Sequence, residues 1–235
     1  MTSNLTIPSL ISDSSIASRR NIVQVNSEIG RVYVDESNKN LKYHSITRIL
    51  GDDPKKKAMI NEWRKRVGKE EAGKISKRAS GKGTRVHHLI EKTIREEDFN
   101  LDDEMPHIQG AYKSLLRGIS LVASGVFDLE RRLISHELKI GGTVDCIGQM
   151  KNGQYAIIDF KTSNKVKKRE WIDSYFMQCT AYSEMLKDET EVSIENLIVL
   201  IAVDDFKEPQ IFLEKRKNWI DPLKTMICDY RERNS

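Results

Sequence analysis

The pattern of hydrophobic and polar positions changes its period along the chain. Up to about residue 123, apolar residues recur every three or four positions, as in Val86, Leu89 and Ile90, which is typical of amphipathic helices. From residue 126 apolar and polar residues alternate, which is typical of strands with one buried face. The pattern predicts helices over 54–71, 84–97, 106–123, 170–186 and 215–230, and strands over 126–137, 139–150, 154–161, 194–203 and 210–213.

This order of elements predicts an α/β (α+β) fold with a central mixed β-sheet flanked by helices. Because 235 residues suffice for one such domain but hardly for two, we expect a single domain over residues 54–235. Residues 1–53 are expected to form an extension. It would contain a disordered or loosely attached tail, a small hairpin around 28–30 and a short helix capped by Ser45 or Thr47.

Composition narrows the class of protein. With 38% hydrophobic and 31% charged residues the sequence is ordinary for a soluble globular protein, and no apolar run approaches the ~18 residues of a membrane-spanning helix. The three cysteines form no CxxC pair, which argues against a disulfide framework, a structural zinc and an iron-sulfur cluster. We expect a soluble intracellular protein. A cytoplasmic location, in a bacterium or a phage-infected host, is favoured over a mitochondrial one because the N-terminus lacks the arginine-rich amphipathic pattern of a presequence.

The positive charge is concentrated in two places. Between Lys55 and Arg85, twelve Lys or Arg residues stand against three acids, and this basic segment leads into the helix predicted over 84–97. A run of charge is usually a solvated helix face, but two basic clusters around a carboxylate motif favour contact with a phosphate backbone. The residues expected to contact nucleic acid are Arg64, Lys65 and Arg66 in the first cluster and Lys165, Lys167 and Lys168 in the second.

The candidate chemistry lies on two of the predicted strands. Asp159 and Lys161 are two residues apart on a strand, so both side chains point to the same face and can share a phosphate. Hydrolysis of a phosphodiester needs a divalent cation held by oxygen ligands and a positive group near the nucleophile. Such a triplet is weak evidence alone, because a salt-bridged surface strand has the same pattern. A metal needs more than one protein ligand, and Asp145 on the preceding strand supplies the second.

The two carboxylates share a face only if the hairpin between them has one particular turn. A two-residue turn would pair Asp145 with Phe160 and leave Asp159 facing away. A three-residue loop over 151–153 pairs Asp145 with Asp159 instead, and Gly153 suits the left-handed position in such a loop. The chemistry therefore predicts the three-residue loop.

Four separated motifs follow one another along the chain. They are the GxxxHxxxE pattern of Gly83, His87 and Glu91, the run Gly142-Thr143-Val144-Asp145, the run Ile158-Asp159-Phe160-Lys161-Thr162-Ser163, and the pair Gln178 and Tyr182. In this order they resemble the RecB-type branch of the PD-(D/E)XK nucleases. The upstream segments 45–50 and 62–64, with His136-Glu137, resemble in particular the mitochondrial genome maintenance exonucleases and their phage-encoded relatives.

This resemblance implies a set of functional residues. It implies that Lys161 is the catalytic lysine, and that Gln178 and Tyr182, one helical turn apart, orient the active site or contact the DNA strand. Some RecB-type nucleases join their ends through an iron-sulfur cluster, whose cysteines this chain lacks, so its fold must close by packing alone. The ligands that the resemblance implies for Mg²⁺ or Mn²⁺ are His87, Asp145, Asp159 and the carbonyl of Phe160.

Several assignments leave an alternative open. By itself His87 would be an ordinary core or surface histidine, and His88 competes with it, but the GxxxHxxxE spacing selects His87. Glu91 is expected to be a partner of His87 or of a basic residue rather than a ligand. Glu137 is a candidate further ligand, with a plain salt bridge as its alternative and with Glu130 as the other choice on the same strand.

Contacts to nucleic acid are also expected just after the catalytic lysine. The hydroxyls of Thr162 and Ser163 could donate to phosphate oxygens or could cap the next helix. Trp171, beside the second basic cluster, could stack on an unpaired base, with core packing as the ordinary alternative for an aromatic residue.

Together these features predict a metal-dependent DNA exonuclease that acts on single strands or DNA ends in replication, repair or recombination. DNA is the expected partner, no membrane is expected, and the sequence does not identify protein partners. A structure-specific endonuclease is the alternative within the enzymes. A non-catalytic nucleic-acid-binding module that retains the fold is the alternative outside them.

Overall fold

The computed structural model describes residues 6–27 and 30–234 and confirms the predicted fold class. Within these residues eight strands form one mixed sheet in the order β1-β2-β3-β5-β6-β7-β8, with β4 paired to β5 off this path. The strands are β1 Ile22–Ser27, β2 Gly30–Asp35, β3 Asn38–Ser45, β4 Ala123–Ser135, β5 Ile140–Met150, β6 Tyr155–Ser163, β7 Asn196–Val203 and β8 Gln210–Lys215. The helices are α1 Ile46–Gly51, α2 Pro54–Val67, α3 Lys69–Ile94, α4 Pro106–Val122, α5 Asp173–Thr190 and α6 Ile220–Asn234.

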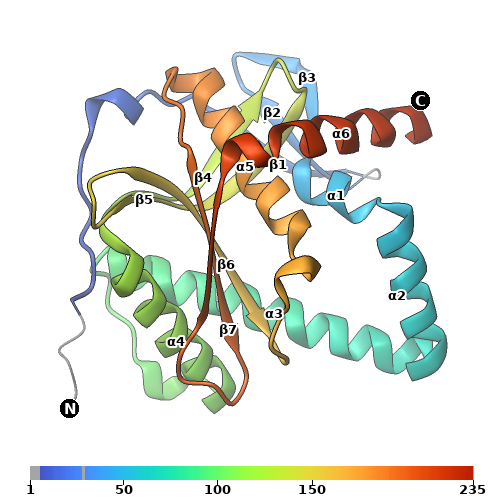
Figure 1. Ribbon diagram of the computed structural model, residues 1–235, viewed down its shortest axis with the longest axis vertical. Coiled ribbons are helices and arrows are strands. Elements are labelled where there is room, and N and C mark those ends of the chain that lie inside the picture. Colours follow the sequence, from blue (N-terminus) through green and yellow to red (C-terminus); the bar gives the residue numbers. More distant parts are fainter. Residues whose placement is uncertain (1–5, 28–29, 235) are drawn as a thin grey trace.

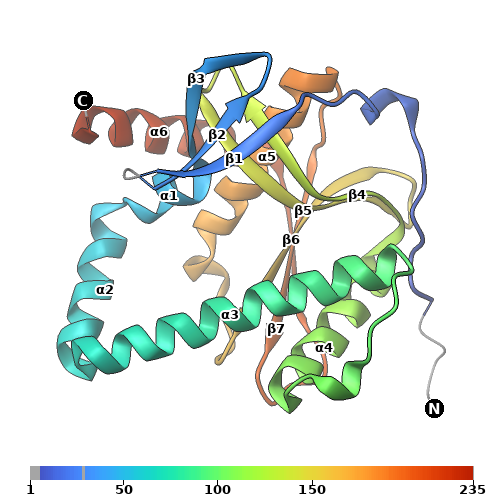
Figure 2. The same cartoon turned by 180° about the vertical axis from the view of Figure 1, so that it is seen from behind.

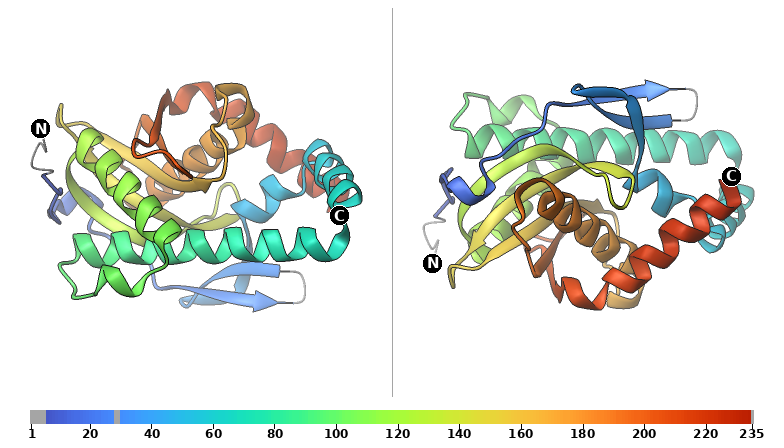
Figure 3. Two further views of the ribbon diagram at one scale, coloured as in Figure 1. Left: turned by 90° about the horizontal axis from the view of Figure 1, so that it is seen from below. Right: turned by 90° about the horizontal axis from the view of Figure 1, so that it is seen from above.

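The sheet is covered on both faces. Helices α3 and α4 lie on one side, and α5 and α6 lie on the other (Figures 1 and 3). Ile158 and Phe160 of β6 pack in the core under α3 and α4, whereas their neighbour Ile157 packs in the core under α5. Because successive residues of a strand point to opposite faces, β6 is buried on both sides. A charged residue on β6 therefore stands in the interior.

The basic segment forms two helices, and the second is longer than predicted. Helix α2 ends where Gly68 adopts a left-handed φ of 93°. Helix α3 then runs without a break to Ile94 (Figure 2), so the prediction that a helix begins at Thr84 is wrong. Gly81 and Gly83 lie inside it. A glycine costs a helix about 1 kcal/mol, but extending a helix that is anchored in a core costs less than nucleating a new one.

The N-terminal tail is packed against the domain over residues 6–21, so the predicted disordered or loosely attached tail is wrong there. The amide of Ile11 donates to the carbonyl of Val126 over 2.8 Å. The buried guanidinium of Arg131 donates to the carbonyl of Ile16 over 2.7 Å. These bonds tie the tail to β4. The first five residues lie outside the described part of the chain.

The small hairpin is present, and it belongs to the main sheet. Strands β1 and β2 pair antiparallel from Ile22 opposite Asp35 to the residues beside the turn, whose centre at 28–29 lies outside the described residues. The third strand, β3, was not predicted because its residues are mostly exposed and polar. It pairs parallel with β5 through Ser45 and Gly141, which joins the N-terminal strands to the rest of the sheet.

Candidate metal site

The site forms where the sheet forks along strand β5. One edge of β5 pairs with β4 over its whole length. The other edge pairs with β3 as far as Gly141 and with β6 from Cys146 onward. Between these two residues the described chain places no strand against that edge, because β3 and β6 diverge. A cleft of about 720 Å³ opens at the fork, and Asp145 lies in it.

The turn predicted for the hairpin of β5 and β6 is confirmed. The amide of Met150 donates to the carbonyl of Gln154, and the amide of Gly153 donates back to Met150. These bonds close a three-residue loop in which Gly153 has a φ of 82°. The left-handed value explains the glycine, because other residues rarely adopt it.

This loop sets the register that brings the two acidic residues together. The last pair of the ladder is Cys146 with Ile158, so Asp145 and Asp159 face each other one position further along. There the ladder ends, because the Oδ2 atom of Asp145 accepts the amide hydrogen of Phe160 over 2.8 Å. The side chain of Asp145 thus takes the place of a backbone carbonyl as the acceptor for Phe160 where β5 and β6 separate.

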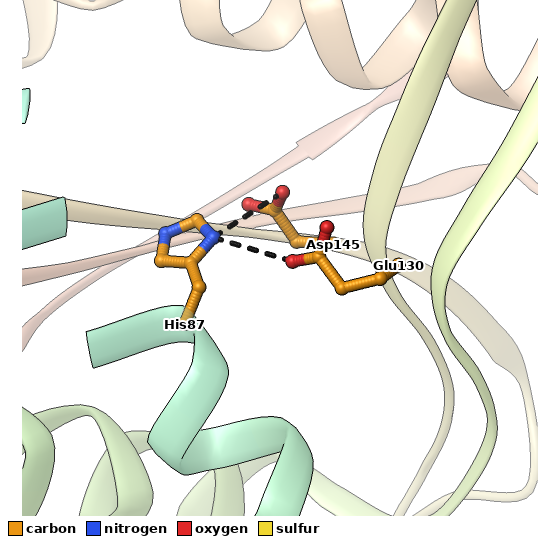
Figure 4. Close-up of side chains that lie close together, drawn as sticks. All are labelled: His87, Glu130 and Asp145. Carbon is orange, nitrogen blue, oxygen red and sulfur yellow. Dashed lines mark ion pairs between the residues drawn. The ribbon is translucent and has the colours of Figure 1, made fainter. Parts of the chain in front are cut away.

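His87, Glu130 and Asp145 lie close enough to hold one cation (Figure 4). The Nδ1 atom of His87 is 3.5 Å from Oε1 of Glu130 and 3.6 Å from Oδ1 of Asp145. One ligand atom from each residue lies within 4.8 Å of the other two. The residues come from α3, β4 and β5, so only the folded chain assembles them. Carboxylates with one imidazole form a donor set that suits a divalent ion such as Mn²⁺ or Mg²⁺.

The carboxylate of β4 that lies beside His87 is that of Glu130, the alternative to Glu137. Glu137 is exposed beyond the end of β4, and its amide donates to Asp188 over 3.3 Å. Glu130 lies opposite Asp145 and has a left-handed φ of 51°. A non-glycine residue in this conformation costs about 1–3 kcal/mol. The backbone at Glu130 is thus strained where its side chain meets the cluster.

Asp159 and Lys161 form a buried ion pair beside this cluster. The Nζ atom of Lys161 is 2.5 Å from Oδ2 of Asp159, whose side chain is 0% exposed. Apart from this ion pair, neither carboxylate oxygen of Asp159 receives a hydrogen bond from the described residues. Burial raises the pKa of Asp159 to about 6, although the ammonium of Lys161 lowers it. A cation at the cluster would relieve this buried carboxylate, so the residues present fit a metal ion.

His87 is oriented from its other side by β6. Its Nε2 atom lies 3.0 Å from the carbonyl oxygen of Phe160, which accepts the hydrogen bond, so Nδ1 faces the carboxylates. Burial lowers the pKa of His87, but the carboxylates of Asp145 and Glu130 outweigh burial and raise it to about 9. The Phe160 carbonyl therefore aligns the histidine ring here, and its role as a metal ligand stays a prediction.

Three residues expected to support the site, Glu91, Gln178 and Tyr182, line the same cleft. Glu91 pairs with Arg95 over 3.0 Å, which matches the expected partnership with a basic residue. The side-chain amide of Gln178 donates to the hydroxyl of Tyr182 over 2.7 Å, and both lie at the cleft. A Cβ on Gly142 would stand 2.6 Å from the Tyr182 ring, so this glycine lets Tyr182 reach the fork.

The predicted nucleic-acid contacts are spread over the surface around the site. Trp171 is 59% exposed, and the ammonium of Lys168 lies 5.4 Å from the centre of its ring. The hydroxyl of Ser163 is engaged in a turn, since it donates to the carbonyl of Lys165 over 2.7 Å. Thr162 is half-buried near α3. The exposed basic side chains are Arg64, Lys65 and Arg66 at the end of α2 and Lys165 and Lys168 after β6, whereas Lys167 is half-buried.

Two further arginines line the cleft, and the sequence patterns did not point to either of them. Arg31 comes from β2 and Arg132 from β4. The sequence offered one indication for Arg132. It follows Glu130 by two positions on a strand, and side chains with this spacing point to the same face of the sheet. Nothing in the sequence around Arg31 connected the hairpin with the site.

The fold and the cluster define a mixed α/β protein with a candidate divalent-metal site at a fork of its sheet. No protein-family model matches the chain. The sequence is 26% identical over 189 residues to "Mitochondrial genome maintenance exonuclease 1" of Mus musculus, which covers 74% of this chain and 55% of that protein. The chain thus spans about half the length of this relative. The match confirms the predicted relationship to the nuclease superfamily.

Two solved structures are similar to the chain at low sequence identity. One is a protein of Eubacterium rectale named as a candidate exonuclease, with a TM-score of 0.45 and 13% identity, covering 66% of this chain and 65% of that one. The other is the protein SSO0001, with a TM-score of 0.42 and 13% identity, covering 80% of this chain and 74% of that one. Every helix among the described residues is too short or too polar to span a membrane.

Proposed function

We propose that this protein is a metal-dependent nuclease that hydrolyses the phosphodiester bonds of DNA. The observation that carries the proposal is the cluster of His87, Glu130 and Asp145 beside the buried pair of Asp159 and Lys161. A plain structural ion pair would not need three further metal-binding side chains at the same fork. The similarity to a protein named as an exonuclease supports the same activity.

We assign each group of the site a role that its surroundings support. The Nδ1 atom of His87 and the carboxylates of Glu130, Asp145 and Asp159 would hold Mg²⁺ or Mn²⁺. When bound, such an ion lowers the pKa of water and neutralises charge on the phosphate. The amide of Phe160 fixes the carboxylate of Asp145, and the carbonyl of Phe160 fixes the ring of His87. The ligands are therefore oriented before a metal or a substrate arrives.

Lys161 would act as a fixed positive charge. Burial lowers the pKa of its ammonium, but the carboxylates of Asp159 and Asp145 outweigh burial and hold the pKa above its ordinary value. The side chain is 22% exposed and lines the cleft, so its Nζ can reach a bound phosphate or the attacking water. Because it stays protonated, we assign it to positioning the nucleophile and stabilising charge in the transition state, not to removing a proton.

The preferred substrate would be a single strand or a DNA end. The enzyme would act in DNA replication, repair or recombination. The basic segment leads to the site, since helix α3 continues from it and carries Thr84, His87 and His88 to the cleft. A strand could thus be guided along α2 and α3 to the cleft. Exposed Trp171 offers a stacking surface for an unpaired base.

Digestion of end-labelled oligonucleotides tests this function. With Mg²⁺ or Mn²⁺ the protein should shorten a linear single strand, EDTA should stop the reaction, and a closed circular single strand should stay intact. Blocking either end in turn identifies the direction of cleavage. Cutting of the circle would establish the endonuclease alternative. Binding without cleavage under every metal would leave a non-catalytic binding module.

A further inference from the structure

We propose that Arg31 and Arg132 bind backbone phosphates of the nucleic-acid strand inside the cleft, so that the N-terminal strands complete the binding site. The inference rests on the proposed nuclease function and deepens it. Helix α3 lines one wall of the cleft with Thr84, His87, His88 and Glu91, and strands β1 and β2 line another with Gln24, Arg31 and Tyr33. The two arginines bring positive charge to the wall that lacks the basic segment.

Arg132 is placed by its strand and by one backbone contact. It pairs across the sheet with Thr143, which lies in the fork, and it follows Glu130 by two residues on β4. Its Nη1 atom donates one long hydrogen bond, 3.5 Å, to the carbonyl of Ile22 on β1. This contact leaves most donors of the guanidinium available to the cleft, where the side chain is exposed.

Arg31 is placed by Tyr33, its neighbour two residues along the same face of β2. The Tyr33 hydroxyl lies 3.0 Å from Oγ1 of Thr143 and 3.3 Å from Oε1 of Gln24. A Cβ on Gly141 would stand 2.6 Å from Cβ of Tyr33, so the tyrosine lies directly over β5. The hairpin is therefore locked against the fork, and Arg31 is held at the cleft although it is exposed.

Arg31 and Arg132 differ from three neighbouring arginines, each of which forms an ion pair with a carboxylate. Arg131 pairs with Glu189 over 2.9 Å, Arg19 with Asp128 over 2.6 Å, and Arg20 with Asp188 over 3.1 Å; these pairs explain their positions. Arg31 and Arg132 have no carboxylate partner among the residues that the structure describes.

The acidic side chains that line the cleft together with the two arginines already have other partners. Glu130 and Asp145 face His87, and Glu91 pairs with Arg95. A guanidinium with free donors, held beside a phosphodiester-hydrolysing site, matches the geometry of phosphate oxygens and can bind them in a bidentate manner. A phosphate in the cleft would thus satisfy both arginines.

Binding measurements on Arg31→Gln, Arg132→Gln and the double variant test the inference. Lys42→Gln is the matched control, because Lys42 lies on the adjacent strand β3 but lines the pocket on the opposite face of the hairpin. The affinity for a fluorescent single-stranded oligonucleotide is measured in EDTA at several salt concentrations. Each arginine variant should bind about tenfold more weakly and reduce the log-log salt slope by about 0.7, whereas Lys42→Gln should match the wild type.

Two further results decide the outcome. Arg132→Lys keeps the charge but loses the planar fork, so it should recover only part of the affinity, and thermal melting checks that every variant is folded. Folded variants with wild-type affinity and salt slope would overturn the inference while leaving the nuclease function intact. A wild-type protein that binds DNA through these arginines but cleaves nothing with Mg²⁺ or Mn²⁺ would overturn the nuclease function alone.

Discussion

The amide of Phe160 donates a hydrogen bond of 2.8 Å to Oδ2 of Asp145, at the point where the ladder between β5 and β6 ends. A backbone donor thus holds one oxygen of the carboxylate, and the other oxygen, Oδ1, faces His87 at 3.6 Å. Because the donor belongs to the residue between Asp159 and Lys161, the strand that bears the proposed catalytic pair also aligns Asp145, a proposed ligand. This pair and the cluster of His87, Glu130 and Asp145 are therefore linked through one peptide unit.

Replacing Lys161 with alanine should separate cleavage from binding. The variant should bind DNA nearly as well as the wild type, because the other proposed cationic contacts to the strand are kept, while the rate of cleavage falls by about 10²-fold or more. Quenched-flow digestion at saturating oligonucleotide, with the affinity measured in EDTA, gives both quantities. Parallel loss of affinity and rate would instead make Lys161 an ordinary phosphate-binding residue.

The two neighbouring histidines should respond differently to substitution. His87→Ala removes an imidazole that faces Glu130 and Asp145, so the Mg²⁺ or Mn²⁺ concentration needed for half-maximal activity should rise by about tenfold or more. His88→Ala, at an exposed position on the next residue of α3, should leave this concentration nearly unchanged. Equal shifts for both variants would remove His87 from the ligand set.

The metal-free protein should lose stability as the pH rises from about 6.5 to about 9, the ordinary and the folded-state pKa of His87. The folded-state pKa of about 9 lies above the ordinary value of 6.5, so protonated His87 stabilises the fold fully below about pH 6.5 and this contribution is lost as the pH rises through 9. Melting temperatures in EDTA should therefore fall over this interval. His87→Gln should flatten that part of the profile, and an unchanged profile would contradict the assignment.

The basic end of α2 should guide the strand without taking part in the chemistry. Replacing Arg64, Lys65 and Arg66 together with alanine should weaken binding and reduce the log-log salt slope by about 0.7 for each phosphate of a single strand that the variant no longer neutralises. The rate at saturating DNA should change little. A triple control removes the same charge from exposed positions outside the cleft: Lys207, Lys217 and Lys224. Equal binding by both triple variants would show that the α2 cluster is a solvated helix face.

Two glycines should have opposite effects on stability when changed to alanine. At Gly142 the new Cβ would stand 2.6 Å from the Tyr182 ring, so Gly142→Ala should destabilise the protein by about 1–3 kcal/mol. At Gly81 the Cβ would meet open space inside α3, so Gly81→Ala should stabilise by about 0.5–1 kcal/mol. Urea unfolding measures both changes. A destabilising Gly81→Ala would mean that α3 is not a continuous helix there.

Features that depend on neighbouring residues were predictable from the sequence. The alternation of apolar and polar residues identified the strands that carry Asp145 and Asp159. The length of a single turn then set their register, because side chains on a strand alternate faces with a period of two. The spacing of Gly83, His87 and Glu91 separated His87 from His88 before any contact was visible.

Features that depend on the packing of distant segments were decided only by the tertiary structure. Glu130 rather than Glu137 lies beside His87 and Asp145, because β4 ends at Ser135 and leaves Glu137 outside the fork. Helix α3 continues past Gly81 because its later turns are anchored in the core. Arg31 of β2 reaches the cleft because the adjacent strand β3 pairs with β5. The paired residues of β3 and β5 are about a hundred positions apart in the chain. Local patterns do not encode such contacts, because their energy arises only when separate elements pack together.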